Sequence, residues 1–359
     1  MSSLEIGIVG LPNVGKSTLF NALTDSNVLA ANYPFATIEP NIGIVPVPDE
    51  RLDKLSRLYK TEKIIPATIQ FVDIAGLVAG ASKGEGLGNQ FLGHIRACSV
   101  IIQVVRAFKD SNVTHVDNDH SPSKDIDVIN TELILADLQT IEKRLPRLEK
   151  EVKANPKLKP MLDSLNHARD YLDKGNPLWS TPEINTEELG DLMLLTSKKI
   201  IYVFNVDEDA LNNEGSKDLL RKLVAPADAL FICAKLEDEL KSLEIYDRIE
   251  LLESYGQKDS GLTQLIKAAY HALGLQSYLT AGQKEVRAWT IPNNATAPQA
   301  AGVIHGDFER GFIAAQIVDY DDLIEAGSEA GAKAAGKMRT EGKDYIMKPG
   351  DVVEFRFNV

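Results

Sequence analysis

The sequence has little of what marks secreted, membrane-spanning or nucleic-acid-coating proteins. Its 359 residues include two cysteines, Cys98 and Cys233, so no disulfide framework is expected and a reducing compartment fits. No apolar run reaches the roughly 18 residues that a membrane-spanning helix needs. Residues 1–3 lead straight into an apolar run, which leaves no room for a signal peptide. The net charge of −13 argues against a generally basic nucleic-acid binder. We expect a cytoplasmic protein with no membrane partner and no sequence-specific contact to DNA.

What the sequence does have is a phosphate-binding pattern near its start. Residues 10–18, GLPNVGKST, fit G-x-x-x-x-G-K-S/T. An apolar run at 4–9 precedes the pattern, and apolar residues at helical spacing follow it over 17–23. A glycine loop between a strand and a helix lets backbone N–H groups surround phosphates beside the positive end of the helix dipole. The predicted nucleotide contacts are Asn13, Val14, Gly15, Lys16, Ser17 and Thr18, with Lys16 on the β- and γ-phosphates and Ser17 on Mg²⁺.

A second motif follows the apolar run at 67–72. It is D-x-x-G, in which Asp73 would hold Mg²⁺ through water and the Gly76 N–H could bond the γ-phosphate. Between the two motifs, Thr37 lies where P-loop GTPases carry a threonine that joins the Mg²⁺ shell. Leu77 stands where Ras-like enzymes place a water-orienting glutamine. Because leucine cannot orient water, we expect slow intrinsic turnover unless another group substitutes.

The base-reading motif is altered. After a strand predicted at 199–204, residues 205–208 read N-V-D-E where GTPases carry N-K-x-D. The aspartate of that motif accepts two N–H bonds from guanine, which adenine does not offer. Here Val206 replaces the lysine and Glu208 is one methylene longer than aspartate, while Asn205 and the backbone at Val206 could still hold a base edge. We therefore predict that ATP is preferred over GTP.

A helical insertion interrupts the nucleotide-binding pattern from about 121 to 197. Two apolar repeats separated by residues 154–156 predict an antiparallel helical hairpin, and Pro146 should kink its first helix. Residues 142–159 carry seven Lys or Arg against three Glu, a net charge of +4. Such a stretch is either a solvated helix face or a docking surface for RNA or another anionic partner. The first repeat contains Ile134, Leu138, Ile141, Leu145, Leu148 and Val152; the second contains Met161, Leu165, Ala168 and Leu172.

The last 80 or so residues predict a small mixed β domain with no evident catalytic constellation. Strand-like runs lie at 286–292, 312–318 and 351–357, and residues 297–305 could form a short helix. A helix over 261–273, with Gly274 at its C-cap, would close the preceding domain.

Taken together, these motifs resemble the Obg-related YchF family over the whole chain. The resemblance rests on residues 10–17, 32–41 (NYPFATIEPN), 80–89 (GASKGEGLGN) and 345–351 (YIMKPGD), the last of which looks like the end of a TGS domain. It implies an α/β fold: a Ras-like, Obg-type P-loop NTPase domain with an inserted antiparallel helical hairpin and a C-terminal TGS-type β-grasp domain. The expected boundaries are 1–120 and 198–276 for the nucleotide-binding domain, 121–197 for the insertion and 277–359 for the TGS domain.

The resemblance also implies an ATPase that uses Mg²⁺ and associates with ribosomes through the insertion and the TGS domain. It implies Mg²⁺ on Ser17 and Thr37, and adenine near Asn205 and Val206. A histidine on a mobile loop would replace the catalytic glutamine, and two positions compete: His115 looks closer to the family's loop, and His94 is the weaker candidate. Either could instead be a plain surface histidine.

Three alternatives stay open at this point. Asn13 also occurs in relatives that use K⁺ for charge neutralisation, so K⁺ is a minor possibility. The chain could be a true Obg-class GTPase. It could also be a nucleotide-gated ribosome- or RNA-binding module in which hydrolysis is incidental.

Overall fold

The computed structural model describes residues 4–24, 41–74, 87–108 and 121–358. The chain divides into two compact units, 1–44 with 70–265 and 45–69 with 266–359. Residues 45–69, which we expected in the nucleotide-binding domain, thus fold with the C-terminal part. The reason is a pairing over more than 200 positions: β3 (Ile64–Ile65) runs parallel to β9 (Val286–Pro292), with Ile64 opposite Val286.

The first unit is built on a six-stranded sheet in the order β2-β4-β1-β5-β6-β7. The pairs β1–β4, β1–β5, β5–β6 and β6–β7 are all parallel. Every residue of β5 is buried, as expected for a strand covered on both faces. Its strands are β1 (Glu5–Gly10), β2 (Ile42–Pro46), β4 (Thr68–Asp73), β5 (Val100–Arg106), β6 (Lys199–Asn205) and β7 (Asp228–Ile232).

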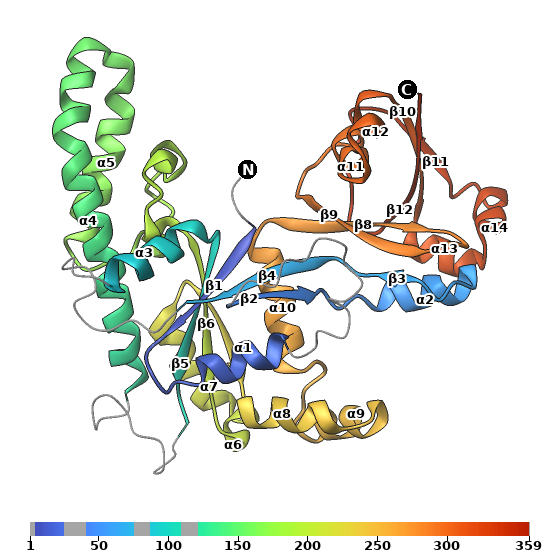
Figure 1. Ribbon diagram of the computed structural model, residues 1–359, viewed down its shortest axis with the longest axis horizontal. Coiled ribbons are helices and arrows are strands. Elements are labelled where there is room, and N and C mark those ends of the chain that lie inside the picture. Colours follow the sequence, from blue (N-terminus) through green and yellow to red (C-terminus); the bar gives the residue numbers. More distant parts are fainter. Residues whose placement is uncertain (1–3, 25–40, 75–86, 109–120, 359) are drawn as a thin grey trace. The chain divides into compact units, whose positions relative to one another are not determined.

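The helices of this unit connect and flank those strands (Figure 1). α1 begins at Lys16, inside the phosphate-binding pattern, and α8 begins just after β7 ends. They are α1 (Lys16–Thr24), α3 (Leu87–Ala97), α4 (Pro122–Ala154), α5 (Lys159–Leu172), α6 (Glu208–Leu211), α7 (Glu214–Val224), α8 (Ala234–Ser242) and α9 (Ile245–Ser254). α10 (Gly261–Ala272) begins in this unit, but residues 266–272 fold with the second unit, so the expectation that this helix closes the nucleotide-binding domain at 276 is wrong.

The helical hairpin is confirmed. Figure 1 shows α4 and α5 lying side by side, joined through a 3₁₀ turn at Pro156–Leu158. The predicted apolar repeats meet in one core cluster, with Ile141, Leu148 and Leu165 fully buried. α4 continues through Pro146, and the predicted kink stays a prediction. The expectation that the insertion is helical up to 197 is wrong for its last part. Residues 173–197 hold three short 3₁₀ turns, at Leu178–Ser180, Glu187–Leu192 and Leu195–Ser197, and no α-helix.

A buried carboxylate fixes the base of the hairpin to the chain that re-enters the sheet. Asp137 of α4 accepts hydrogen bonds from the backbone N–H groups of Leu195 (2.8 Å) and Thr196 (2.7 Å) and from the Thr196 hydroxyl (2.7 Å). Burial raises the pKa of Asp137 even though these donors favour its charged form. The same contact ends the insertion just before β6 begins.

The second unit has a mixed six-stranded sheet in the order β11-β10-β12-β8-β9-β3. Its core joins the sheet to α11 (Ala297–Ile304), which confirms the helix predicted at 297–305. The TGS-type label stays a prediction. The other elements are α2 (Glu50–Tyr59), β8 (Leu275–Ala281), α12 (Gly306–Arg310), β10 (Phe312–Asp319), α13 (Tyr320–Ala326), α14 (Glu329–Ala334), β11 (Arg339–Glu341) and β12 (Asp351–Phe357). Among the helices of the described residues, none has the length and apolar character to cross a membrane.

Candidate functional site

The carboxyl ends of four parallel strands converge on one large cavity in the first unit. β1, β4, β6 and β7 end at Gly10, Asp73, Asn205 and Ile232. Ligands of open α/β sheets bind at this edge, beyond the carboxyl ends of the strands. The cavity measures about 1430 Å³ and is lined by residues 11–13, 15–18, 21, 41, 73, 108, 205–209, 233–235, 238 and 241.

One end of this cavity is the turn between β1 and α1, which carries the phosphate-binding pattern; we call it the phosphate end. Asn13 and Gly15 take left-handed backbone conformations, with φ of 64° and 95°. A side chain at position 15 would also clash, because a Cβ there would lie 2.4 Å from Asn205 Nδ2. The glycine of the motif is therefore required twice, once for its φ and once for space. Lys16, Ser17 and Thr18 follow in the first turn of α1 and line the cavity.

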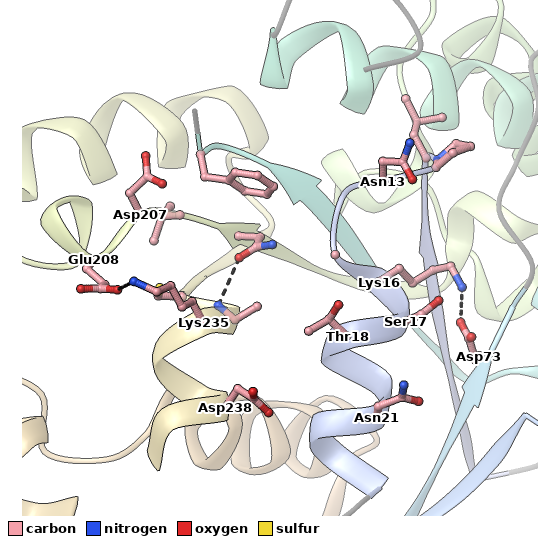
Figure 2. A pocket seen from close by; sticks show the side chains of 18 of the residues that line it. Asn13, Lys16, Ser17, Thr18, Asn21, Asp73, Asp207, Glu208, Lys235 and Asp238 are labelled. Carbon is pink, nitrogen blue, oxygen red and sulfur yellow. Dashed lines mark hydrogen bonds and ion pairs between the residues drawn. The ribbon is translucent and has the colours of Figure 1, made fainter. Parts of the chain in front are cut away.

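Lys16 and Asp73 contact each other across the phosphate end. The Lys16 ammonium donates to Asp73 Oδ1, and their side chains are 11% and 17% exposed (Figure 2). The backbone N–H of Asp73 is held by Asn41 O at 2.8 Å, which fixes the end of β4. The structure thus brings together the lysine of the first motif and the aspartate of the second. The hydroxyl of Ser17 lines the same end of the cavity (Figure 2).

Asn205 connects the phosphate end to the part of the cavity lined by residues 205–209 and 233–235. We call this part the base end, after the altered base-reading motif that it carries. Asn205 Nδ2 donates to Val14 O (3.1 Å), and its Oδ1 accepts from the Ala234 N–H (3.3 Å). The side chain therefore connects the phosphate-binding loop, β6 and the start of α8. The neighbouring Val206 is buried, and its N–H is bound to Ile232 O at 2.9 Å. An amide nitrogen has two hydrogens, so Asn205 can hold Val14 and still donate to a ligand.

Both oxygens of the Glu208 carboxylate accept hydrogen bonds from side chains of this chain. Oε1 accepts from Lys235 Nζ (2.9 Å), and Oε2 accepts from the Tyr255 hydroxyl (3.0 Å). Figure 2 shows Glu208 and Lys235 pointing toward each other. The hydrogen bond from Lys235, followed by that from Tyr255, lowers the pKa of Glu208 below its usual value. Where GTPases present a carboxylate to guanine, this chain directs one to its own side chains.

Four predicted positions lie outside the described residues: Thr37, Gly76, Leu77 and His115. His94 is described and is exposed near the end of α3, and it is not among the residues that line the cavity. The sequence did not indicate Asn21, Phe108, Asp238 or Lys241 as lining residues. It also gave no signal for Tyr255, which follows α9. No motif spacing connects this residue with Glu208, its hydrogen-bond acceptor 47 positions earlier.

A second candidate surface is the basic stretch of the hairpin. Arg144 and Arg147 both bind Glu151, at 2.7 and 2.9 Å. The lysines of this stretch are exposed, and within the described residues none of them forms an ion pair. They are Lys143, Lys150, Lys153, Lys157 and Lys159. Their charge is therefore available to an anionic partner.

Comparison with known proteins covers almost the whole chain. A family model described as "50S ribosome-binding GTPase" matches residues 5–155, and the model YchF-GTPase_C, described as "Protein of unknown function (DUF933)", matches residues 275–358. The "Ribosome-binding ATPase YchF" of Bacillus subtilis (strain 168) is 49% identical over 99% of this chain and 100% of the relative. The protein of the same name from Escherichia coli O157:H7 is 50% identical over 99% of both chains.

A solved structure agrees with these matches. The "Schizosaccharomyces pombe YchF GTPase" is 39% identical, with a TM-score of 0.86 over 99% of this chain and 98% of that one. The similarity therefore includes the sheet, the phosphate-binding loop and the C-terminal unit. With its P-loop cavity and these matches over nearly its full length, the chain belongs to the YchF family of P-loop NTPases.

Proposed function

We propose that this protein is a nucleotide-switch ATPase that hydrolyses ATP with Mg²⁺ and associates with the ribosome. The observation that carries the choice of nucleotide is the engagement of Glu208 by Lys235 and Tyr255. Two bacterial relatives are named ribosome-binding ATPases, while the Schizosaccharomyces pombe relative is named a GTPase. The names of relatives therefore do not decide between adenine and guanine. The choice of ATP is argued from the residues at the base end.

At the phosphate end, Lys16, Ser17 and Asp73 would hold a magnesium nucleotide. Mg²⁺ prefers oxygen ligands and keeps several waters, which suits one hydroxyl and one carboxylate beside a phosphate. In the described residues no group of three or more His, Cys, Asp or Glu could hold a metal by itself. The donor set thus fits a metal that arrives with the nucleotide phosphates. Lys16 would then neutralise phosphate charge, and Asp73 would hold the metal's water. Thr37 would complete the metal shell, and Gly76 would contact the γ-phosphate.

At the base end, the carboxylate that the GTPase motif would offer to guanine is already engaged. Glu208 satisfies Lys235 and Tyr255, and moving it to a guanine would leave both donors without that acceptor. Asn205 and the backbone at Val206 would hold the base edge, and adenine requires no carboxylate there. We infer that ATP binds more tightly than GTP.

Isothermal titration with Mg-ATP and Mg-GTP tests this choice. We expect ATP to bind at least about tenfold more tightly, a difference of about 1.4 kcal/mol. GTP bound at least about tenfold more tightly than ATP would instead identify an Obg-class GTPase. Repeating both titrations in K⁺ and Na⁺ buffers tests Asn13: a K⁺ requirement for tight binding or turnover supports a role in charge neutralisation.

Hydrolysis needs a group that orients water, because Leu77 cannot. We propose His115 for this role, with His94 as the weaker candidate because it is exposed on α3 and does not line the cavity. Single-turnover rates of His115→Ala and His94→Ala discriminate between them. A large loss in one variant identifies the catalyst. Unchanged rates in both variants would favour the nucleotide-gated binding module in which hydrolysis is incidental.

The hairpin lysines would bind ribosomal RNA. A protein that binds ribosomes in this way would be located in the cytoplasm. The names of the relatives support association with a ribosome, and the five lysines that form no ion pair within the described part of the chain support docking through the hairpin. Ribosome co-sedimentation of Lys143→Glu/Lys150→Glu/Lys157→Glu, with and without an ATP analogue, should show a strong loss at low salt. Co-sedimentation of the wild type should fall as salt rises, and the variant should depend less on salt. The matched control is Lys54→Glu/Lys222→Glu/Lys258→Glu, at exposed positions elsewhere. Equal losses in both variants would contradict docking by the hairpin.

A further inference from the structure

Helix α9 exposes apolar side chains that a helix in a compact protein normally buries. Of its ten residues, Leu252 alone is classed as buried. Ile245, Tyr246 and Ile249 are 65%, 83% and 49% exposed. Ile245 and Ile249 are four residues apart and therefore lie on the same face, with Tyr246 beside them. Three large apolar side chains on one short helix form a contiguous patch of the kind that marks an interaction site.

A groove lined by residues of α8, of α9 and of the turn between them lies beside this patch, since Glu250 of the groove is four residues from Tyr246 and on the same side of α9. It measures about 550 Å³ and is lined by residues 239, 242, 243, 247, 250, 251 and 254. Its apolar part is Leu243 and Leu251, and its charged groups are Glu239, Asp247 and Glu250. No ion pair of the described residues involves any of these three carboxylates. The nearby cations are engaged elsewhere: Lys241 contacts Asp238, and Arg248 donates to Leu243 O.

The charge of this region selects the class of partner. Residues 234–254 carry seven Asp or Glu against three Lys or Arg, a net charge of −4. RNA and anionic lipid surfaces are repelled by such a surface. A metal ion is not favoured either, because the described residues contain no group of three or more His, Cys, Asp or Glu that could hold one. Basic side chains of a protein would find acceptors in the groove, while its apolar side chains could cover Ile245, Tyr246 and Ile249.

We propose that the α8–α9 surface, residues 234–254, binds a basic amphipathic helix of a partner protein. A partner helix can lie along α9, with apolar side chains at i, i+3, i+4 and i+7 on the patch and basic side chains on its flank toward the groove. Its Lys or Arg side chains reach Glu239, Asp247 and Glu250. This partner is distinct from the nucleotide, and its surface is opposite in charge to the basic hairpin stretch, which has a net charge of +4.

The test uses the full chain and a fluorescein-labelled synthetic peptide. The peptide has about 16 residues, long enough for four helical turns, with Leu at i, i+3, i+4 and i+7 and Arg or Gln elsewhere. Fluorescence anisotropy at about 150 mM salt suppresses long-range charge attraction. We expect saturable binding that weakens at least about tenfold in Asp247→Lys/Glu250→Lys and in Tyr246→Ser/Ile249→Ser. The peptide with every Leu replaced by Ser should bind at least about tenfold more weakly.

Matched controls distinguish specific binding at the α8–α9 surface from general electrostatic or apolar attraction to the protein. Asp321→Lys/Glu325→Lys changes two exposed carboxylates of α13, and Leu219→Ser/Leu223→Ser changes two exposed leucines of α7. Both should alter the peptide's Kd by less than about threefold. Equal losses in surface and control variants, or equal binding of the Leu-to-Ser peptide, would overturn the proposal. So would binding of a single-stranded RNA that Tyr246→Ser/Ile249→Ser abolishes. Asp247→Asn/Glu250→Gln repeats the charge test with a milder change should the lysine variant fail to fold.

Discussion

The two ends of the nucleotide cavity follow different rules. The phosphate end keeps the features that any P-loop protein needs: a left-handed Gly15, a lysine at the helix start and an aspartate at the end of the next parallel strand. The base end departs from the GTPase pattern, and its carboxylate is bound to Lys235 and Tyr255. Because the phosphates are the same in every nucleoside triphosphate, the residues of the phosphate end can stay the same while different residues at the base end select a different base.

The largest effect should come from the phosphate end. Lys16→Ala removes a cation from the phosphates and leaves Asp73 without its ion-pair partner. We expect affinity for both ATP and GTP to fall by about a hundredfold, or about 2.7 kcal/mol. Titration calorimetry measures this loss, with the exposed Lys54→Ala as the control. Loss of binding to one nucleotide alone would contradict a base-independent phosphate end.

A second substitution affects both ends together. Gly15→Ala combines an unfavourable φ with a Cβ that would meet Asn205 Nδ2 at 2.4 Å. Displacing Asn205 breaks its contacts to Val14 and Ala234, so nucleotide affinity should fall at least about tenfold. Gly175→Ala is the matched control, because Gly175 has a φ of 80° but no heavy atom within 4 Å of an added Cβ. Both should lose about 1 kcal/mol of stability through strain. If Gly175→Ala also lowered affinity, the clash with Asn205 would not be the cause.

A smaller and more selective effect is expected at the base end. Lys235→Ala/Tyr255→Phe removes both partners of Glu208 and frees its carboxylate. The ratio of GTP to ATP affinity should rise by roughly fivefold, since a free carboxylate can accept guanine N–H groups. Lys241→Ala, at another residue that lines the cavity, serves as the control. An unchanged ratio would show that the engagement of Glu208 does not determine the base.

The smallest expected effect is a pH dependence of stability. The hydrogen bonds from Lys235 and Tyr255 hold the folded-state pKa of Glu208 below its ordinary value of 4.5. The stabilisation is therefore complete above pH 4.5 and is lost as pH falls through the lower folded value. The Tm difference between the wild type and Glu208→Gln should be constant near neutral pH and shrink below pH 4.5. In a Lys235→Ala/Tyr255→Phe background, Glu208→Gln should show no such trend, because both hydrogen-bond donors are absent.

Local patterns predicted most of the first unit because its signals are local. The strand–loop–helix at residues 4–24, the apolar repeat of α4 and the strand before Asn205 each depend on nearby residues. The end of the insertion was mispredicted because its backbone is held by a distant residue. Asp137 is nearly 60 positions from the N–H groups that it binds. The assignment of residues 45–69 failed for the same reason, since β3 pairs with a strand from the far end of the chain.

By itself, the sequence determined the phosphate-binding loop, its lysine and aspartate, the altered base motif and the hairpin, because spacing along the chain specifies them. The tertiary structure decided what those residues do to one another. It brought Asn205 against Val14 and Ala234, and it turned Glu208 toward Lys235 and Tyr255. It also left Tyr246 and its neighbours on α9 exposed beside the carboxylates of the groove. These contacts join residues from separate elements, and only packing of the folded chain determines which side chains meet.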